Sequence, residues 1–129
     1  MVDADVICCT NAGAADSVFK RYLNKRIFDM VVIDECGQGL EVSCWIPMLK
    51  ARRAVLAGDH KQLPPTVKSQ KQNNLLSYTL FSRAMEELPF VQSTMLKVQY
   101  RMNEKIMAWS NQMFYNNQLK AHKSVEGHE

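Results

Sequence analysis

The chain has 129 residues, of which 47% are hydrophobic and 22% are charged. This composition is typical of one globular domain with a core, and it excludes a chain that is disordered throughout. The net charge of +3 is too small to indicate a particular partner. The apolar runs are much shorter than the roughly 20 residues of a membrane span, and the acidic N-terminus does not resemble a secretory signal. We therefore expect no membrane partner.

The four cysteines contain no C-x-x-C pair, and the three histidines are scattered. This spacing does not favour a zinc site. We interpret Cys8, Cys9, Cys36 and Cys44 as buried, reduced thiols, which are typical of an intracellular protein of the cytoplasm or nucleus.

Short apolar runs predict four strands. The first three runs are nearly continuous, as in parallel strands that are covered on both faces. The predicted strands span 5–10, 28–34, 53–58 and 94–99.

Helical spacing of apolar residues predicts three helices and a weaker fourth, which alternate with the strands. Pro47 should kink or stop the first strong helix, and Pro89 should end the next. Asn103 is a suitable cap for the last. The strong helices span 40–50, 76–88 and 102–115, and the weaker one spans 16–26. Strands that alternate with helices predict an α/β fold with a parallel sheet.

Three apolar stripes follow from these helices. The stripes should face the core. They comprise Val42, Trp45, Ile46 and Leu49; then Leu76, Leu80, Phe81, Ala84 and Leu88; then Met102, Ile106, Trp109 and Met113. Residues 64–74 are expected to form a loop, and residues 120–129 a frayed polar tail.

Ligands of parallel sheets bind beyond the carboxyl ends of the strands. In the second predicted strand, the apolar run at 30–33 is followed by Asp34 and Glu35. Asp34 is a suitable Mg²⁺ ligand, because this ion binds one or two carboxylates together with phosphate oxygens and water. Glu35 is a suitable base for orienting an attacking water. The alternative is a strand end at which two acids meet solvent.

Polar side chains also follow the other predicted strands. Gln62 lies in a loop stiffened by Pro64 and Pro65, where it could sense a phosphate; the alternative is a rigid surface turn. Arg101 can bind a phosphate as a planar fork, and the adjacent Tyr100 can stack on a base. Here the alternative is a surface arginine beside a half-buried tyrosine. The small residues after Thr10 permit a close backbone approach to a phosphodiester, but this segment taken alone favours the alternative, a plain turn.

Together these segments resemble motifs II, III and IV of superfamily 1 helicases, in particular the up-frameshift-like group and its immunoglobulin mu-binding members. The resemblance covers nearly the whole chain. The motifs are Asp34-Glu35-x-x-Gln38, Gly58-Asp59-x-x-Gln62-Leu63-Pro64-Pro65 and Gln99-Tyr100-Arg101-Met102. Gly37 differs from the Ala or Ser that is frequent in such relatives.

The resemblance implies a RecA-like P-loop NTPase fold that uses ATP and Mg²⁺ to move 5′ to 3′ on single-stranded DNA or RNA. It implies that Asp34 and Glu35 are the Walker B pair and that Asp34 holds the metal. Four further residues would contact ATP: Gln62 and Arg101 at the γ-phosphate, Gln38 near it, and Tyr100 on adenine. Thr10 and Asn11, with Pro65 and Thr66 nearby, would line the nucleic-acid track.

The phosphate-binding sequence G-x-x-x-x-G-K-[ST] is not found in this chain. By resemblance, residues 1–119 are the C-terminal part of the first RecA-like domain, a partial parallel sheet flanked by helices that lacks the P-loop strand. A P-loop segment and a second RecA-like domain are then expected in the parent protein. We expect the isolated chain to be inactive toward ATP. The alternative is an ATP-independent module that binds single-stranded nucleic acid through Lys61, Lys68 and Lys71.

Overall fold

The computed structural model describes residues 4–17, 21, 27–68 and 76–127. The chain forms two compact units, Met1–Val91 and Gln92–Glu129. Most of the weak helix candidate at 16–26, and residues 69–74 of the predicted loop, lie outside the described residues. In the described part of the chain, every helix is too short or too polar to cross a membrane.

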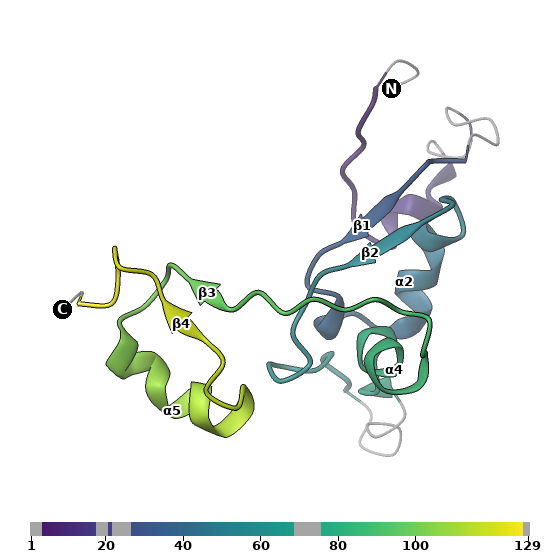
Figure 1. Cartoon of the computed structure of the whole chain (residues 1–129). Helices are drawn as coiled ribbons and strands as arrows, with labels where there is room; N and C mark the ends of the chain where they lie inside the picture. The colour runs from purple at the N-terminus through teal and green to yellow at the C-terminus, as the bar shows by residue number, and fades with distance from the viewer. Residues whose placement is uncertain (1–3, 18–20, 22–26, 69–75, 128–129) are drawn as a thin grey trace. The chain divides into compact units, whose positions relative to one another are not determined.

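The first unit is built on two parallel strands. Strand β1 (Val31–Ile33) pairs with β2 (Ala54–Leu56), with Val32 opposite Val55 (Figure 1). A bridge between Phe28 and Ala51 extends the pairing toward the start of both strands. These strands fall within the second and third predicted runs, so that part of the α/β prediction is confirmed.

Two helices of the first unit enclose the core beside this strand pair. The first, α2 (Glu41–Met48), ends one residue after Pro47, as expected of a helix that proline stops. The second, α4 (Leu80–Glu87), is capped by Thr79, whose side chain accepts a hydrogen bond from the backbone N–H of Ser82. The buried core consists of Ile33, Cys36, Cys44 and Leu80.

The strand pair is covered less completely than the apolar runs predict. Ile33 is buried in the core, but Val32 points to the opposite face and is 63% exposed. Val55, its partner on β2, is exposed as well. A continuous apolar run therefore did not indicate burial on both faces here.

The buried face of α2 also differs from the predicted stripe. Val42, Trp45 and Leu49 are exposed, whereas Cys44 is fully buried and Met48 packs against the core. The reason is that apolar residues surround most of this helix, so that several faces satisfy the same spacing. In α4 the expected residues Leu80 and Ala84 are buried, but Leu76 lies before the helix and is exposed, so that stripe is confirmed only in part.

The predicted strand at 5–10 is wrong. Residues 6–10 have no regular secondary structure, and a short 3₁₀ helix, η1 (Gly13–Ala15), follows them. A strand depends on a hydrogen-bonded neighbour, which an apolar run by itself does not supply. Cys8 and Cys9 are consequently exposed, contrary to the expectation of four buried thiols.

The second unit is a small strand–helix–strand motif. Strand β3 (Val98–Gln99) pairs in parallel with β4 (Lys120–Ala121), and helix α5 (Glu104–Phe114) connects them (Figure 1). Asn103 caps α5 as predicted, because its side chain accepts a hydrogen bond from the N–H of Lys105. The segment expected to fray at 120–129 thus begins with a paired strand.

The buried face of α5 is not the predicted one. Met107 and Asn111 are buried, while Ile106, Trp109 and Met113 are exposed. The amide of Asn111 donates to the carbonyl oxygen of Leu119 at 3.0 Å and accepts from its N–H at 2.9 Å. This two-way contact holds the residue before β4 against the helix.

Candidate functional site

The acidic pair lies on a tight turn at the carboxyl end of β1. A carboxylate oxygen of Asp34 accepts a hydrogen bond from the N–H of Glu35 at 2.9 Å. Glu35 has a left-handed backbone, with φ 51° and ψ 36°, and caps the 3₁₀ helix η2 (Cys36–Gln38). Such a conformation costs a non-glycine residue on the order of 1 kcal/mol and is frequent at functional sites. Both carboxylates are exposed to solvent.

Within this turn, Gln38 and Glu35 are brought together. The side-chain amide of Gln38 donates to a carboxylate oxygen of Glu35 at 3.0 Å. One turn of 3₁₀ helix places residues three apart on the same side, which allows this contact. The two residues that the motif reading assigned to one phosphate network are therefore in direct contact.

The loop that follows β2 packs against this turn. The N–H of Cys36 donates to the carbonyl oxygen of Ala57 at 2.8 Å, so the strand pairing continues past the end of β1. A side-chain carbon on Gly58 would lie 2.8 Å from the backbone nitrogen of Gly37. The two loops thus meet through their backbones at two glycines, and each loop limits the position of the other.

Asp59 organises the loop that carries Gln62. Its carboxylate accepts hydrogen bonds from the N–H of Lys61 and from the side-chain amide of Gln62, both at 2.9 Å. The motif reading assigned no role to this aspartate. The signal that could have identified it is the spacing Gly-Asp-x-x-Gln, in which an aspartate at the start of a turn bonds the backbone two residues later.

The arrangement suits a magnesium ion that is shared with phosphates. In the described part of the chain, no three His, Cys, Asp or Glu side chains group into a metal site of their own. Mg²⁺ needs no such group when phosphate oxygens and water complete its octahedron. The exposed Asp34, at the carboxyl end of a parallel strand, has the chemistry of such a ligand.

A third turn, in the second unit, carries Tyr100 and Arg101. The side-chain oxygen of Gln99 accepts hydrogen bonds from the N–H groups of Arg101 at 2.7 Å and Met102 at 2.9 Å. Its amide donates to the carbonyl oxygen of Met102 at 2.6 Å. Gln99 therefore closes the turn, and Tyr100 and Arg101 are exposed on it. This glutamine belongs to the motif Gln99-Tyr100-Arg101-Met102, but the motif alone indicated no structural role for it.

The residues expected along a nucleic-acid track have different surroundings. The hydroxyl of Thr10 accepts a hydrogen bond from the N–H of Gly13 at 3.0 Å. The amide of Asn11 donates to the sulfur of the buried Cys44 at 3.7 Å, so this side chain points toward the core. Pro65 is buried and Thr66 is exposed.

The predicted site residues therefore divide between the two units. Asp34, Glu35 and Gln38, together with the Gln62 loop, belong to Met1–Val91, whereas Tyr100 and Arg101 belong to Gln92–Glu129. Their convergence on one triphosphate stays a prediction.

Two buried thiols lie directly behind the acidic turn. The sulfur atoms of Cys36 and Cys44 are 3.8 Å apart, and both residues are free cysteines. Burial, together with the neighbouring Cys44 thiol, raises the pKa of Cys36 to about 12. The Cys36 thiol therefore stays protonated at neutral pH, and both cysteines act as core residues.

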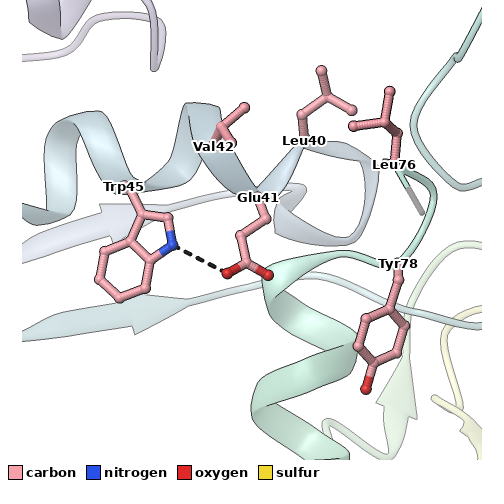
Figure 2. Close-up of a pocket in the computed structure, with 6 residues that line it drawn as sticks. All are labelled: Leu40, Glu41, Val42, Trp45, Leu76 and Tyr78. Atoms are coloured by element: carbon pink, nitrogen blue, oxygen red, sulfur yellow. Dashed lines mark hydrogen bonds between the residues drawn. The ribbon is translucent and has the colours of Figure 1, made fainter. Parts of the chain in front are cut away.

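An open pocket of about 290 Å³ lies elsewhere in the first unit and includes none of the predicted site residues. Figure 2 shows its lining, in which the indole N–H of Trp45 donates to the Glu41 carboxylate at 3.1 Å. Arg83 bonds the same carboxylate through two nitrogens, and these bonds lower the pKa of Glu41. The lining residues are Leu40, Glu41, Val42, Trp45, Leu76 and Tyr78.

Comparison with protein families identifies the class. Residues 1–70 match one family described as AAA domain, and residues 76–129 match a second family with the same description. The first match covers more than half of the chain, so the chain belongs to the AAA domain family.

Individual relatives are similar over nearly the whole chain. DNA-binding protein SMUBP-2 of Rattus norvegicus is 49% identical over 126 residues, which are 97% of this chain and 13% of that protein. An uncharacterized ATP-dependent helicase of Methanocaldococcus jannaschii is 50% identical, over 98% of this chain and 18% of its own length. DNA polymerase alpha-associated DNA helicase A of Saccharomyces cerevisiae is 40% identical, over 97% and 20% respectively.

These relatives confirm the resemblance to helicases that the motifs indicate, including the immunoglobulin mu-binding members. The chain spans between 13% and 20% of the length of these three curated relatives.

Proposed function

We propose that this chain is part of the ATP-driven motor of a helicase, within a RecA-like domain that moves 5′ to 3′ on single-stranded DNA or RNA. One observation carries the proposal. The acidic turn and the Gln62 loop contact each other at the carboxyl end of a parallel strand pair, where α/β sheets bind their ligands. The names of the relatives, which include ATP-dependent and DNA helicases, support the same reading.

In the proposed mechanism, the residues of the first unit act on ATP and the attacking water. Asp34 would hold Mg²⁺, and the bound ion would supply charge neutralisation at the phosphates. Glu35 orients the water and accepts its proton, and the hydrogen bond from Gln38 fixes the direction of the Glu35 carboxylate. Asp59 holds the side-chain amide of Gln62. Gln62 contacts the γ-phosphate and links its presence to the surface that binds nucleic acid.

The second unit supplies the remaining contacts in this proposal. Arg101 binds the γ-phosphate as a planar fork, and Tyr100 stacks on the adenine. Gln99 positions both residues through its closed turn. On the nucleic-acid side, we assign backbone contacts to the Thr10–Asn11 turn and to Thr66 beside Pro65. An intracellular location, in the cytoplasm or nucleus, fits a protein with these partners.

The chain by itself should not hydrolyse ATP. Phosphoryl transfer depends on positioning and charge stabilisation, and the P-loop that supplies both is not part of this sequence. We expect the P-loop and a second RecA-like domain to come from the remainder of the parent protein, with residues 1–119 in the first domain.

The experiment is Glu35→Gln in the full-length protein that contains this chain. We expect ATP binding to persist and hydrolysis to be lost, because glutamine keeps the shape of the side chain but accepts no proton. Glu104→Gln, at an exposed position on α5, is the matched control and should hydrolyse ATP normally. Unchanged hydrolysis in the Glu35 variant would refute the proposal.

The second candidate function is an ATP-independent module for single-stranded nucleic acid. It is favoured by the basic stretch between Lys50 and Lys71, in which Lys61 and Lys68 are exposed. Lys71, the third residue assigned to this role, lies outside the described residues.

A further inference from the structure

The ring of Tyr100 already has a stacking partner within its own unit. The centroids of the Tyr100 and His122 rings are 4.3 Å apart, and the ring planes are inclined by 29°. Tyr100 directly follows β3, and His122 directly follows β4. The N–H of His122 donates to the carbonyl oxygen of Gln99 at 2.9 Å, so the backbone pairing of the strands fixes both residues.

A second set of hydrogen bonds fixes the imidazole. The Nδ1 atom of His122 accepts a hydrogen bond from the backbone N–H of Ser124 at 3.2 Å, and the Ser124 hydroxyl lies 2.9 Å from the same nitrogen. Because a backbone N–H can only donate, Nδ1 is the acceptor in this contact. The carbonyl oxygen of His122 accepts from the N–H groups of Val125 and Glu126. The imidazole is therefore held by contacts that do not involve Tyr100.

An aromatic ring has two faces, and this arrangement occupies one of them. Tyr100 remains 64% exposed, which leaves its other face open to a planar ligand. A ring that is supported from behind loses less rotational freedom when a base stacks on it, and such preorganisation favours binding.

We infer that His122, held by Ser124, is a positioning residue for nucleotide binding: it supports the back of Tyr100, whose front face receives the base. The inference rests on the proposed function, in which Tyr100 stacks on adenine. His122 is 22 positions after Tyr100, and nothing in its sequence surroundings indicates this role.

The test uses the full-length protein and measures KM and kcat for ATP. In His122→Ala, the loss of one aromatic pair should raise KM by about 2- to 12-fold and leave kcat nearly unchanged. His122→Phe keeps a ring behind Tyr100 and should restore most of the affinity. Lys123→Ala, an exposed neighbour, is the control and should behave as wild type. Circular dichroism confirms that each variant is folded.

A double-mutant cycle separates positioning from a general structural role. If His122 acts through Tyr100, then His122→Ala has no further effect on KM in a Tyr100→Ala background. If His122→Ala raises KM equally in both backgrounds, the inference is overturned. A fall in KM in His122→Ala would also overturn it, because it would mean that the imidazole occupies the place of the base. An unchanged KM in Tyr100→Ala alone would instead remove the proposed role of Tyr100, and the inference with it.

Discussion

A side-chain carbon on Gly37 would lie 2.9 Å from the backbone oxygen of Asp59. Gly37 belongs to the turn that carries the acidic pair, and Asp59 holds the side chain of Gln62. The two proposed phosphate-sensing elements are thus in backbone contact, with no flexible side chain between them. A displacement of the acidic turn therefore also displaces the loop that carries Gln62. Such coupling is expected if both segments respond to the same phosphate.

This contact predicts the effect of Gly37→Ala. The added methyl group meets backbone atoms, which yield less easily than the end of a side chain, so we expect the free energy of unfolding to fall by about 1–3 kcal/mol. Gly127→Ala is the matched control, because no atom lies within 4 Å of the added carbon there. Urea unfolding of both variants gives the comparison. Equal midpoints for wild type and Gly37→Ala would mean that the two loops separate without cost.

The four thiols should react in two classes. Cys8 and Cys9 are exposed, whereas Cys36 is 1% exposed and Cys44 is fully buried. The raised pKa of Cys36 further lowers its thiolate fraction. With a thiol reagent at about pH 8, we expect two fast equivalents, and two slow ones that appear at the rate of unfolding. Four fast equivalents in the folded chain would contradict the packing of the core.

The ion pair between Glu41 and Arg83 predicts a dependence of stability on pH. The hydrogen bonds from Arg83 lower the pKa of Glu41 below its ordinary value of 4.5. A carboxyl group whose pKa is lower in the folded state stabilises the protein above its unfolded pKa, and this stabilisation is lost as the pH falls through the folded pKa. Glu41→Gln should therefore lower the urea midpoint at about pH 6 and change it much less at about pH 3.

Glu104→Gln serves as the control for this measurement, since that carboxylate is exposed on α5. A loss of stability in Glu41→Gln that is the same at both pH values would attribute the effect to packing of the side chain and not to its charge.

A salt titration distinguishes the two candidate functions of the isolated chain. If Lys61 and Lys68 bind the backbone of single-stranded DNA, the affinity should fall steeply between about 50 mM and about 200 mM salt, as counterion release requires. The Lys61→Ala, Lys68→Ala double variant should weaken binding and flatten this slope. Absence of binding at the lower salt concentration would eliminate the ATP-independent module and leave the motor fragment.

The local sequence predicted the elements that carry the site. The apolar runs before Asp34 and Gly58 became β1 and β2, and Pro47 and Asn103 marked a helix end and a helix start as expected. These features depend only on residues that are close in the chain. The ring of Pro47 has no N–H to donate, and the side chain of Asn103 caps the turn that follows it. The link between Gln38 and Glu35 also lies within a single turn.

Contacts between residues distant in the chain were decided by the tertiary structure. The apolar run at 5–10 has no strand partner, while Lys120 and Ala121, at the start of the segment expected to fray, do have one. In α2 and α5, apolar residues surround so much of each helix that the sequence alone does not specify the buried face. Packing against other elements selected it, and Cys44 and Met107 are the buried residues.

Amino-acid order by itself determined which residues have the chemistry to bind a nucleotide, because a carboxylate, an amide or a guanidinium carries the same donor and acceptor atoms in any fold. Only the three-dimensional arrangement decided which of them are neighbours. Hydrogen bonds and ring stacking act over a few ångströms, and the chain must fold before Gly37 reaches Asp59 or His122 reaches Tyr100.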